Sequence, residues 1–267
     1  MAPRSSTVPR AVSVRSDVVV KIQEPAASRR ERLRTLAGQK VGQQTGLFLV
    51  PGIVSFDDAR GEIVFERLPL VGLGRALSDP NRSMELIGRV AKGLAAIHGQ
   101  MEPAEGARTH GGALGMGAQR DPAPVHGDFG VFNVLFHADS DRMVVIDWAN
   151  ADWIGFDADL GAPEIDVAVF LISLFHRRPF GPWRISRRHA VARHFLATYA
   201  EAAPHGLDMG TLNAVLSTIT PAFVRLTRRQ KGSLKAIAYR HGLLDLRSFL
   251  WRLSPKTFPG IRQPHTG

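Results

Sequence analysis

The chain of 267 residues contains no cysteine, and it carries only three acidic residues after residue 170. Without cysteine there can be no disulfide scaffold, no thiolate zinc site, no iron–sulfur cluster and no thiol nucleophile. No apolar run approaches the ~20 residues of a membrane-spanning helix. The opening residues, MAPRSSTVPR, are not followed by the apolar core of a secretory signal. We therefore expect a cytoplasmic protein.

Hydrophobic residues make up 44% of the chain, which excludes wholesale disorder, and the length allows one large domain or two modest ones. Charge is unevenly spread. Residues 1–100 carry 15 basic and 9 acidic groups, residues 101–170 carry 3 and 12, and residues 171–267 carry 16 and 3. An acidic middle between basic flanks suits a site for a metal-bound anion, although solvated faces give the same pattern.

Strand-like and helical patterns alternate before a break at Pro69 to Gly74, where we place a lobe boundary. They predict a strand over Val18–Ile22 paired with Ala11–Arg15, a helix over Ser28–Leu36 ending at Gly38, and strands over Leu47–Val54 and Glu62–Leu68.

Helical periodicity dominates the rest of the chain. It predicts helices over Arg82–His98, Ile165–Phe175, Arg187–Ala202, Thr211–Arg229 and Ser233–Leu253, with an irregular connection over Glu102–Asp121. Pro221 is expected to kink or split the fourth helix. The layout indicates an α+β fold with a small strand-rich lobe over residues 1–70 and a larger, mostly helical lobe over residues 71–267.

The segment with residues suited to catalysis runs from His126 to Trp148. If Val134–His137 and Met143–Asp147 pair as a hairpin with opposite positions summing to 280, Asn133 faces Asp147. Directly opposed side chains lie ~5 Å apart. An amide oxygen beside a carboxylate suits Mg²⁺, which takes one or two carboxylates together with substrate phosphates.

Asp128 lies five residues before Asn133, in a loop that contains Gly127 and Gly130. A carboxylate there can accept the proton of a substrate hydroxyl during phosphoryl transfer. Taken singly, His-Gly-Asp is a common turn and Ile-Asp-Trp a common strand end. The combination of acid, amide and acid at hairpin-compatible spacing favours a functional site.

At these residues the sequence resembles the aminoglycoside phosphotransferase and choline kinase family, small-molecule relatives of the protein kinases. The resemblance rests on His126-Gly-Asp128 with Asn133, on Ile146-Asp147-Trp148, and more loosely on Gly161 to Ala168. It implies a two-lobed protein-kinase-like fold that binds ATP and Mg²⁺ between its lobes. Without an activation segment, a protein Ser/Thr kinase is less favoured.

The resemblance also implies roles for individual residues. Asp128 would be the catalytic base, and Asn133 and Asp147 the metal ligands. Lys21 would hold the nucleotide phosphates, with Glu31 as its helix partner and Glu24 as the alternative. The remaining implied roles are a hinge against adenine (Glu66, Arg67, Leu68), a brace of the catalytic loop (Asp166) and packing beneath that loop (His126).

One departure from the family pattern concerns the loop that normally covers the triphosphate. The 20 residues before Lys21 contain no glycine, so this loop must be short or built from Ser5, Ser6 and Thr7. A catalytically weak pseudokinase or nucleotide-binding module is therefore an alternative function.

Composition bears on the acceptor as well. Four acidic residues after the metal motif could bind a polycation such as an aminoglycoside: Asp152, Asp157, Asp159 and Glu164. The basic last third instead favours an anionic acceptor, with a lipid or lipid-linked sugar as the leading choice.

The last helix mixes leucines with arginines and could contact an anionic membrane, or pack as a core helix with a charged outer face. No nucleic acid partner is expected, because no basic motif interleaved with aromatics is present. The oligomeric state is left open.

Overall fold

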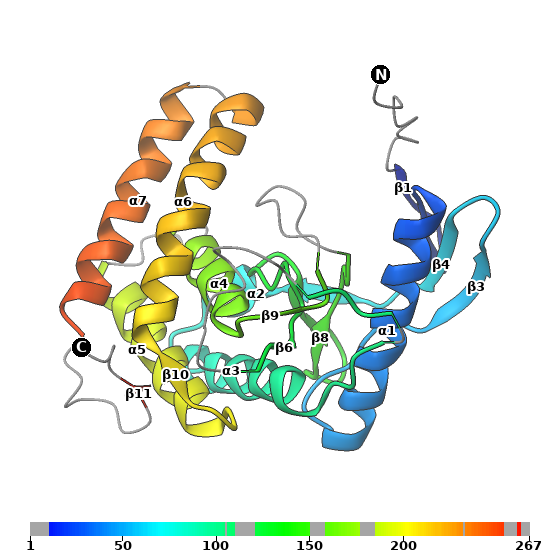
Figure 1. Ribbon diagram of the computed structural model, residues 1–267, viewed down its shortest axis with the longest axis horizontal. Coiled ribbons are helices and arrows are strands. Elements are labelled where there is room, and N and C mark those ends of the chain that lie inside the picture. Colours follow the sequence, from blue (N-terminus) through cyan, green and yellow to red (C-terminus); the bar gives the residue numbers. More distant parts are fainter. Residues whose placement is uncertain are drawn as a thin grey trace.

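The structure, a computed structural model, describes residues 11–104, 106–109, 121–149, 158–176, 185–231, 233–253 and 261–262. A strand-rich part with one long helix lies on one side and a mostly helical part on the other (Figure 1). This is the α+β, two-lobed arrangement that the sequence predicts. None of the helices in the described ranges is both long and apolar enough to cross a bilayer.

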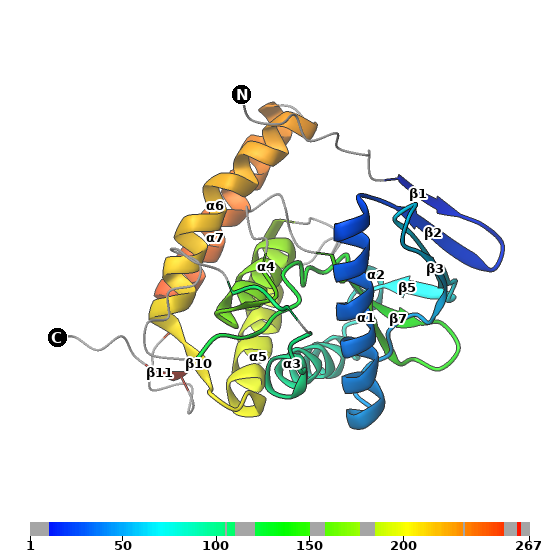
Figure 2. The same cartoon turned by 45° about the vertical axis from the view of Figure 1, so that its right-hand side comes forward.

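The first sheet is antiparallel and has the strand order β1-β2-β4-β3. Its strands are β1 (Ala11–Val14), β2 (Val18–Ile22), β3 (Ile53–Asp57) and β4 (Glu62–Glu66). The predicted hairpin between the first two strands is confirmed, with Val14 opposite Val19. Helix α1 (Pro25–Thr45) packs across this sheet and reaches down to the second lobe (Figure 2).

Helix α1 is longer than the sequence predicts, because Gly38 does not end it. A Cβ at Gly38 would lie 2.4 Å from Cζ2 of Trp148, so this glycine serves close packing within the helix. The helix ends instead at Gly46, whose φ of 69° is the left-handed conformation that glycine adopts without strain.

The strand predicted over Leu47–Val54 is also wrong for most of its length, since β3 begins at Ile53. The preceding residues leave the first sheet and pair with the second lobe. Leu49 N donates to Met143 O at 2.7 Å, and Val145 N donates to Leu49 O at 2.9 Å. Phe48 is fully buried there, so apolar residues that read as a sheet strand serve the contact between lobes.

A second sheet is ordered β5-β7-β8, and the two predicted metal ligands, Asn133 and Asp147, lie just before β7 and just after β8. It contains β5 (Leu70–Gly72), β7 (Val134–His137) and β8 (Met143–Val145). Because Phe136 lies opposite Met143, opposite positions sum to 279 and the predicted register is wrong by one residue. The turn is shorter than expected: His137 N donates to Arg142 O, and Asp141 adopts a φ of 54°.

The rest of the described residues include six helices and two short strand pairs. They are α2 (Leu73–Ala76), α3 (Ser83–Gln100), α4 (Glu164–His176), α5 (Ile185–Ala202), α6 (Met209–Lys231), α7 (Ser233–Trp251), β6 (Ala123–Pro124) with β9 (Leu160–Gly161), and β10 (Leu207–Asp208) with β11 (Ile261–Arg262). The predicted helices are confirmed, and Pro221 does not split α6. The division into lobes at residue 70 stays a prediction.

Candidate active site

The loop that carries Asp128 is held by a buried carboxylate on α4. Asp166 accepts hydrogen bonds from His126 N at 2.6 Å and from Gly127 N at 2.7 Å, and His98 Nε2 donates to it at 3.0 Å. Burial alone would raise the pKa of Asp166, but the hydrogen bond and charge of His98 hold it below its usual value. The carboxylate therefore fixes the backbone directly before Asp128.

His126 is fully buried beneath the same loop. Its Nε2 lies 3.1 Å from Ile146 O and its Nδ1 lies 3.3 Å from Asp128 N, a pattern that fits the neutral tautomer with the proton on Nε2. Burial lowers its pKa to about 4. His126 thus links the loop to the end of β8 and carries no charge at neutral pH.

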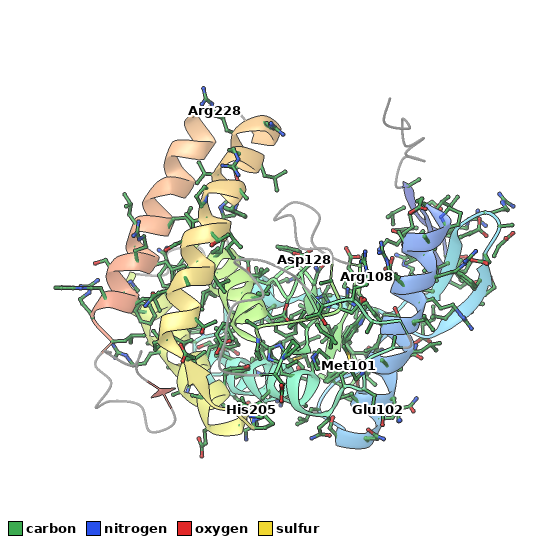
Figure 3. All side chains as sticks on the ribbon, in the orientation of Figure 1. Met101, Glu102, Arg108, Asp128, His205 and Arg228 are labelled. Atoms are coloured by element: carbon green, nitrogen blue, oxygen red, sulfur yellow. The ribbon has the colours of Figure 1, made fainter. Side chains whose placement is uncertain are left out.

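Asp128 and Asn133 lie side by side, five residues apart in the chain. The Asn133 amide nitrogen donates to Asp128 Oδ2 at 3.1 Å and to Asp128 O at 2.9 Å. Asn133 is 5% exposed, so this geometry is held by its surroundings. Figure 3 shows Asp128 at the surface of the second lobe that faces the gap between α1 and the α6–α7 pair, with Met101 and Glu102 on the opposite side.

Lys21, Glu31 and Asp147 form an ionic cluster from both lobes. Lys21 Nζ lies 2.5 Å from Glu31 Oε1 and 2.7 Å from Asp147 Oδ1, while only 5% of Lys21 is exposed. Asp147 has a φ of 58°, uncommon for a residue with a side chain, and its side chain stays 29% exposed. The cluster joins a β2 lysine to Asp147, the second residue after β8.

A cavity of about 220 Å³ opens above this cluster, between β1, β2 and the end of β4. Its walls are mostly apolar, and Lys21, Glu31 and Asp147 supply one charged end. Glu66, Arg67 and Leu68 line it as well, and Arg67 N donates a hydrogen bond to Asp17 O. Within the described residues, the buried Thr35 hydroxyl in the wall has no hydrogen-bond partner.

Comparison with known proteins gives no match to any family model or to the sequence of any curated protein. Solved structures do match. Choline kinase LicA from Streptococcus pneumoniae has a TM-score of 0.54 and 14% identity, over 93% of both chains. Aminoglycoside phosphotransferase APH(3'')-Id from Streptomyces rimosus has a TM-score of 0.53 and 14% identity, over 80% of this chain and 92% of that chain. The chain has the fold of these small-molecule kinases.

Glucosamine kinase in complex with glucosamine, ADP and inorganic phosphate is a further structure with this kinase-like fold. Its TM-score is 0.57 at 17% identity, over 92% of this chain and 80% of that chain. At such identities the likeness establishes the fold, and the chemistry has to be argued from this chain's own residues.

Asn133 and Asp147 supply the atoms that a divalent metal would need. The predicted direct opposition of the two residues is wrong, because Asn133 O accepts from Ile146 N at 3.0 Å and Asp147 is the next residue along. The side-chain nitrogen of Asn133 donates to Asp128, so the side-chain oxygen is the atom of this amide that could bind a metal. Two oxygen ligands fit Mg²⁺, which completes its shell with phosphate and water. Among the described residues, no group of three or more His, Cys, Asp or Glu side chains is arranged to hold a metal ion.

The structure separates other expected residues from the site. Of the two candidate partners of Lys21, Glu31 makes the contact, while Glu24 is exposed before α1. Asp159 and Glu164, considered for a polycation, are buried and accept from Arg108 N and Asp208 N, respectively. Ser5, Ser6, Thr7, Asp152 and Asp157 lie outside the described residues.

Two residues that were given no role of their own from the sequence also shape the site. Trp148 is 1% exposed and packs between Gly38 of α1 and His126, with its ring 4.7 Å from the imidazole. Arg34 of α1 donates to two carbonyls of the loop before Asp128. Nothing local in the sequence marks Arg34, whereas Trp148 is the last residue of the Ile146-Asp147-Trp148 motif.

Proposed function

We propose that the protein is a kinase that transfers the γ-phosphoryl group of ATP, bound with Mg²⁺, to a hydroxyl group of a small-molecule, sugar or lipid-linked acceptor. The observation that carries this proposal is the convergence of Lys21 and Asp147 at the charged end of an apolar cavity. Asn133, which donates to Asp128, also accepts from the backbone of Ile146, the residue before Asp147. The kinase-like fold supports it.

The nucleotide base would lie in the apolar part of the cavity, against the Glu66–Leu68 hinge. Lys21, steadied by Glu31, would bind phosphate oxygens at the charged end. Asn133 and Asp147 would hold Mg²⁺, which neutralises charge on the transferred phosphate. Asp128 would accept the proton of the acceptor hydroxyl, and its orientation depends on the Asn133 amide.

The test is transfer of radiolabelled γ-phosphate from ATP to pooled cell-extract metabolites and lipids. Wild-type protein should label an acceptor only with Mg²⁺ present. Asp128→Asn should lower kcat by about 10³-fold and leave the fold intact. Asp139→Asn, the same change in an exposed turn, is the matched control. Nucleotide binding without transfer or hydrolysis would favour the pseudokinase alternative, and an unchanged kcat in Asp128→Asn would refute the base assignment.

For the acceptor, we propose an anionic molecule. The last third of the chain is strongly basic, and Figure 3 places Arg228 at the projecting end of α6, on the side of the molecule where Asp128 lies. Asp159 and Glu164 are engaged in internal hydrogen bonds and so are unsuited to bind a polycation. An aminoglycoside-type acceptor is the second candidate, favoured by the similar solved structures. Rates with phosphorylated sugars and with aminoglycosides would separate the two.

We also propose that α7 rests on an anionic membrane surface. Leu244, Arg247 and Trp251 lie at i, i+3 and i+7, and so they form one face of the helix, here called the α7 outer face. Leu244 is 53% exposed and Trp251 is 89% exposed. The only acidic residue of α6 and α7, Asp245, contacts His189 instead. An exposed tryptophan beside arginines is typical of helices that bind anionic bilayers.

A further inference from the structure

Arg34 is a buried arginine in the middle of α1, with only 3% of its side chain exposed. Its Nη2 donates to Val125 O at 2.7 Å and to His126 O at 2.6 Å. Its Nε lies 3.7 Å from Asp159 Oδ1, the carboxylate that offsets part of the cost of burying the guanidinium. A helix of the first lobe is thus bonded directly to the loop backbone of the second.

The loop before Asp128 is therefore held from two sides. Asp166 of α4 accepts from the amides of His126 and Gly127, and Arg34 of α1 donates to the carbonyls of Val125 and His126. Because the backbone N–H and the backbone C=O of His126 are both hydrogen-bonded, the backbone leading into Asp128 has little freedom to rotate. Because Asp128 follows two residues later, its direction depends on both anchors.

The same helix also sets the position of Lys21. Glu31 lies one turn before Arg34 and contacts Lys21 Nζ at 2.5 Å. Gly38 lies about one turn after Arg34 and packs against Trp148. Helix α1 thus carries, on consecutive turns, a contact to the lysine, a contact to the Asp128 loop and a contact to the residue after Asp147.

We propose that Arg34 is a positioning residue that sets the placement of Asp128 relative to Lys21, and so the alignment of the acceptor hydroxyl with the transferred phosphate. The inference rests on the proposed function. Arg34 is buried and does not line the cavity, so it would act through the loop. Its removal should lower kcat far more than it weakens nucleotide binding, because Lys21, Glu31 and the cavity walls stay in place.

The experiment compares Arg34→Met and Arg34→Lys with Arg29→Met, a matched control on the same helix. Arg29 is 60% exposed and pairs with Asp58 at the surface, so its loss should change little. Three quantities are measured on the full chain: hydrogen exchange of the amides of residues 126–128 without nucleotide, the Kd of a fluorescent ATP analogue, and kcat per folded molecule.

In Arg34→Met we expect at least tenfold faster exchange at residues 126–128, a change in Kd below threefold and a loss of kcat of about 100-fold. Arg34→Lys keeps the charge and should recover part of both exchange protection and kcat. A kcat per folded molecule equal to that of Arg29→Met would overturn the proposal, as would equal losses in Kd and kcat.

Failure of the proposed function gives a different result. If wild-type protein transfers no phosphate to any acceptor, the exchange measurement still decides whether Arg34 orders the loop, because it needs neither nucleotide nor acceptor. Unchanged exchange in both Arg34 variants would then overturn the inference. If Arg34→Met does not fold, exchange and kcat are measured on Arg34→Lys alone. Exchange and kcat equal to those of the wild type would then refute the proposal.

Discussion

Lys21 brings two carboxylates from different lobes to one point, where its single positive charge faces both. Glu31 is 2% exposed and would lose its charged partner without the lysine, because Gln23 provides only a neutral amide donor. Removing one member of a buried ion pair costs about 3–5 kcal/mol, since the other charge is left buried. The residue therefore bears on stability as well as on the proposed phosphate binding.

Lys21→Met should lower the free energy of unfolding by about 3 kcal/mol and raise the Kd for ATP at least tenfold. Denaturant titration and nucleotide titration measure the two effects. Lys40→Met is the matched control, because Lys40 pairs with Glu102 at the surface, where the two side chains are 52% and 74% exposed. Equal stability of the two variants would contradict the structural role of Lys21.

His126 predicts a dependence of stability on pH. Its pKa is about 4 in the folded chain, against about 6.5 for an unperturbed histidine, so between these pH values the unfolded chain binds the extra proton. Its contribution is therefore complete above pH 6.5 and is lost as the pH falls toward 4, by an amount on the order of 3 kcal/mol. The lowered pKa of Asp166 acts in the same direction at lower pH.

Denaturant titrations from pH 7 to pH 4 test this dependence on wild-type protein and on His126→Gln. Wild-type stability should fall steadily below pH 6.5. The variant should be less stable at pH 7 and should show a shallower fall, because glutamine does not titrate. A wild-type curve that is flat between pH 6.5 and 4.5 would rule out the buried neutral imidazole.

Among the helices and strands, α1 is the one that contacts Lys21, the loop before Asp128 and Trp148. Gly38 is the point where it approaches Trp148 most closely, and a Cβ there would meet three atoms of the indole ring within 2.8 Å. Overpacking of this kind costs about 1–3 kcal/mol, and the helix or the indole has to shift to relieve it. Since Trp148 follows Asp147, the shift should reach the phosphate end of the cavity.

Gly38→Ala is accordingly expected to lower the free energy of unfolding by about 1–3 kcal/mol and to weaken ATP binding. Intrinsic helix propensity works in the opposite direction, by about 1 kcal/mol in favour of alanine. Gly72→Ala is the control, because a Cβ at Gly72 meets nothing within 4 Å. A stabilised Gly38→Ala variant would show that the close approach to Trp148 does not exist.

How far the elements could be predicted depends on how local their signals are. The β1–β2 hairpin and the helices have patterns within a few consecutive residues, and the structure confirms them. The predictions for the end of α1 and for the path of residues 47–52 were wrong. Both depend on contacts with Trp148 and Met143, which lie about a hundred residues away in the chain. The register of β7 and β8 shifted by one residue because the turn is a residue shorter than assumed.

The same distinction holds for the site across the whole molecule. Asp128 and Asn133 are five residues apart and could be paired from the sequence. Lys21 and Asp147 are 126 residues apart, so only the family resemblance linked them. Arg34 and His126, 92 residues apart, belong to no motif that the sequence displays, and their contact needed the fold.

Charge asymmetry is the property of the whole molecule with the plainest consequence. The basic last third and the α7 outer face predict binding to vesicles that contain phosphatidylglycerol and not to phosphatidylcholine alone. Raising the salt from about 0.1 M to about 1 M shortens the screening length from ~10 Å to ~3 Å and should release the protein. Vesicle flotation measures both effects.

The double variant Trp251→Ala with Arg247→Glu should lose most vesicle binding, because it removes the exposed indole and reverses one charge on the α7 outer face. A matched control changes one exposed leucine and one exposed arginine of the first lobe, Leu36→Ala with Arg60→Glu. Net charge changes equally in the two variants, so equal losses would mean diffuse attraction without a docking face. Binding retained only by the control places the contact on α7, and ATP turnover without acceptor should be the same in all three proteins.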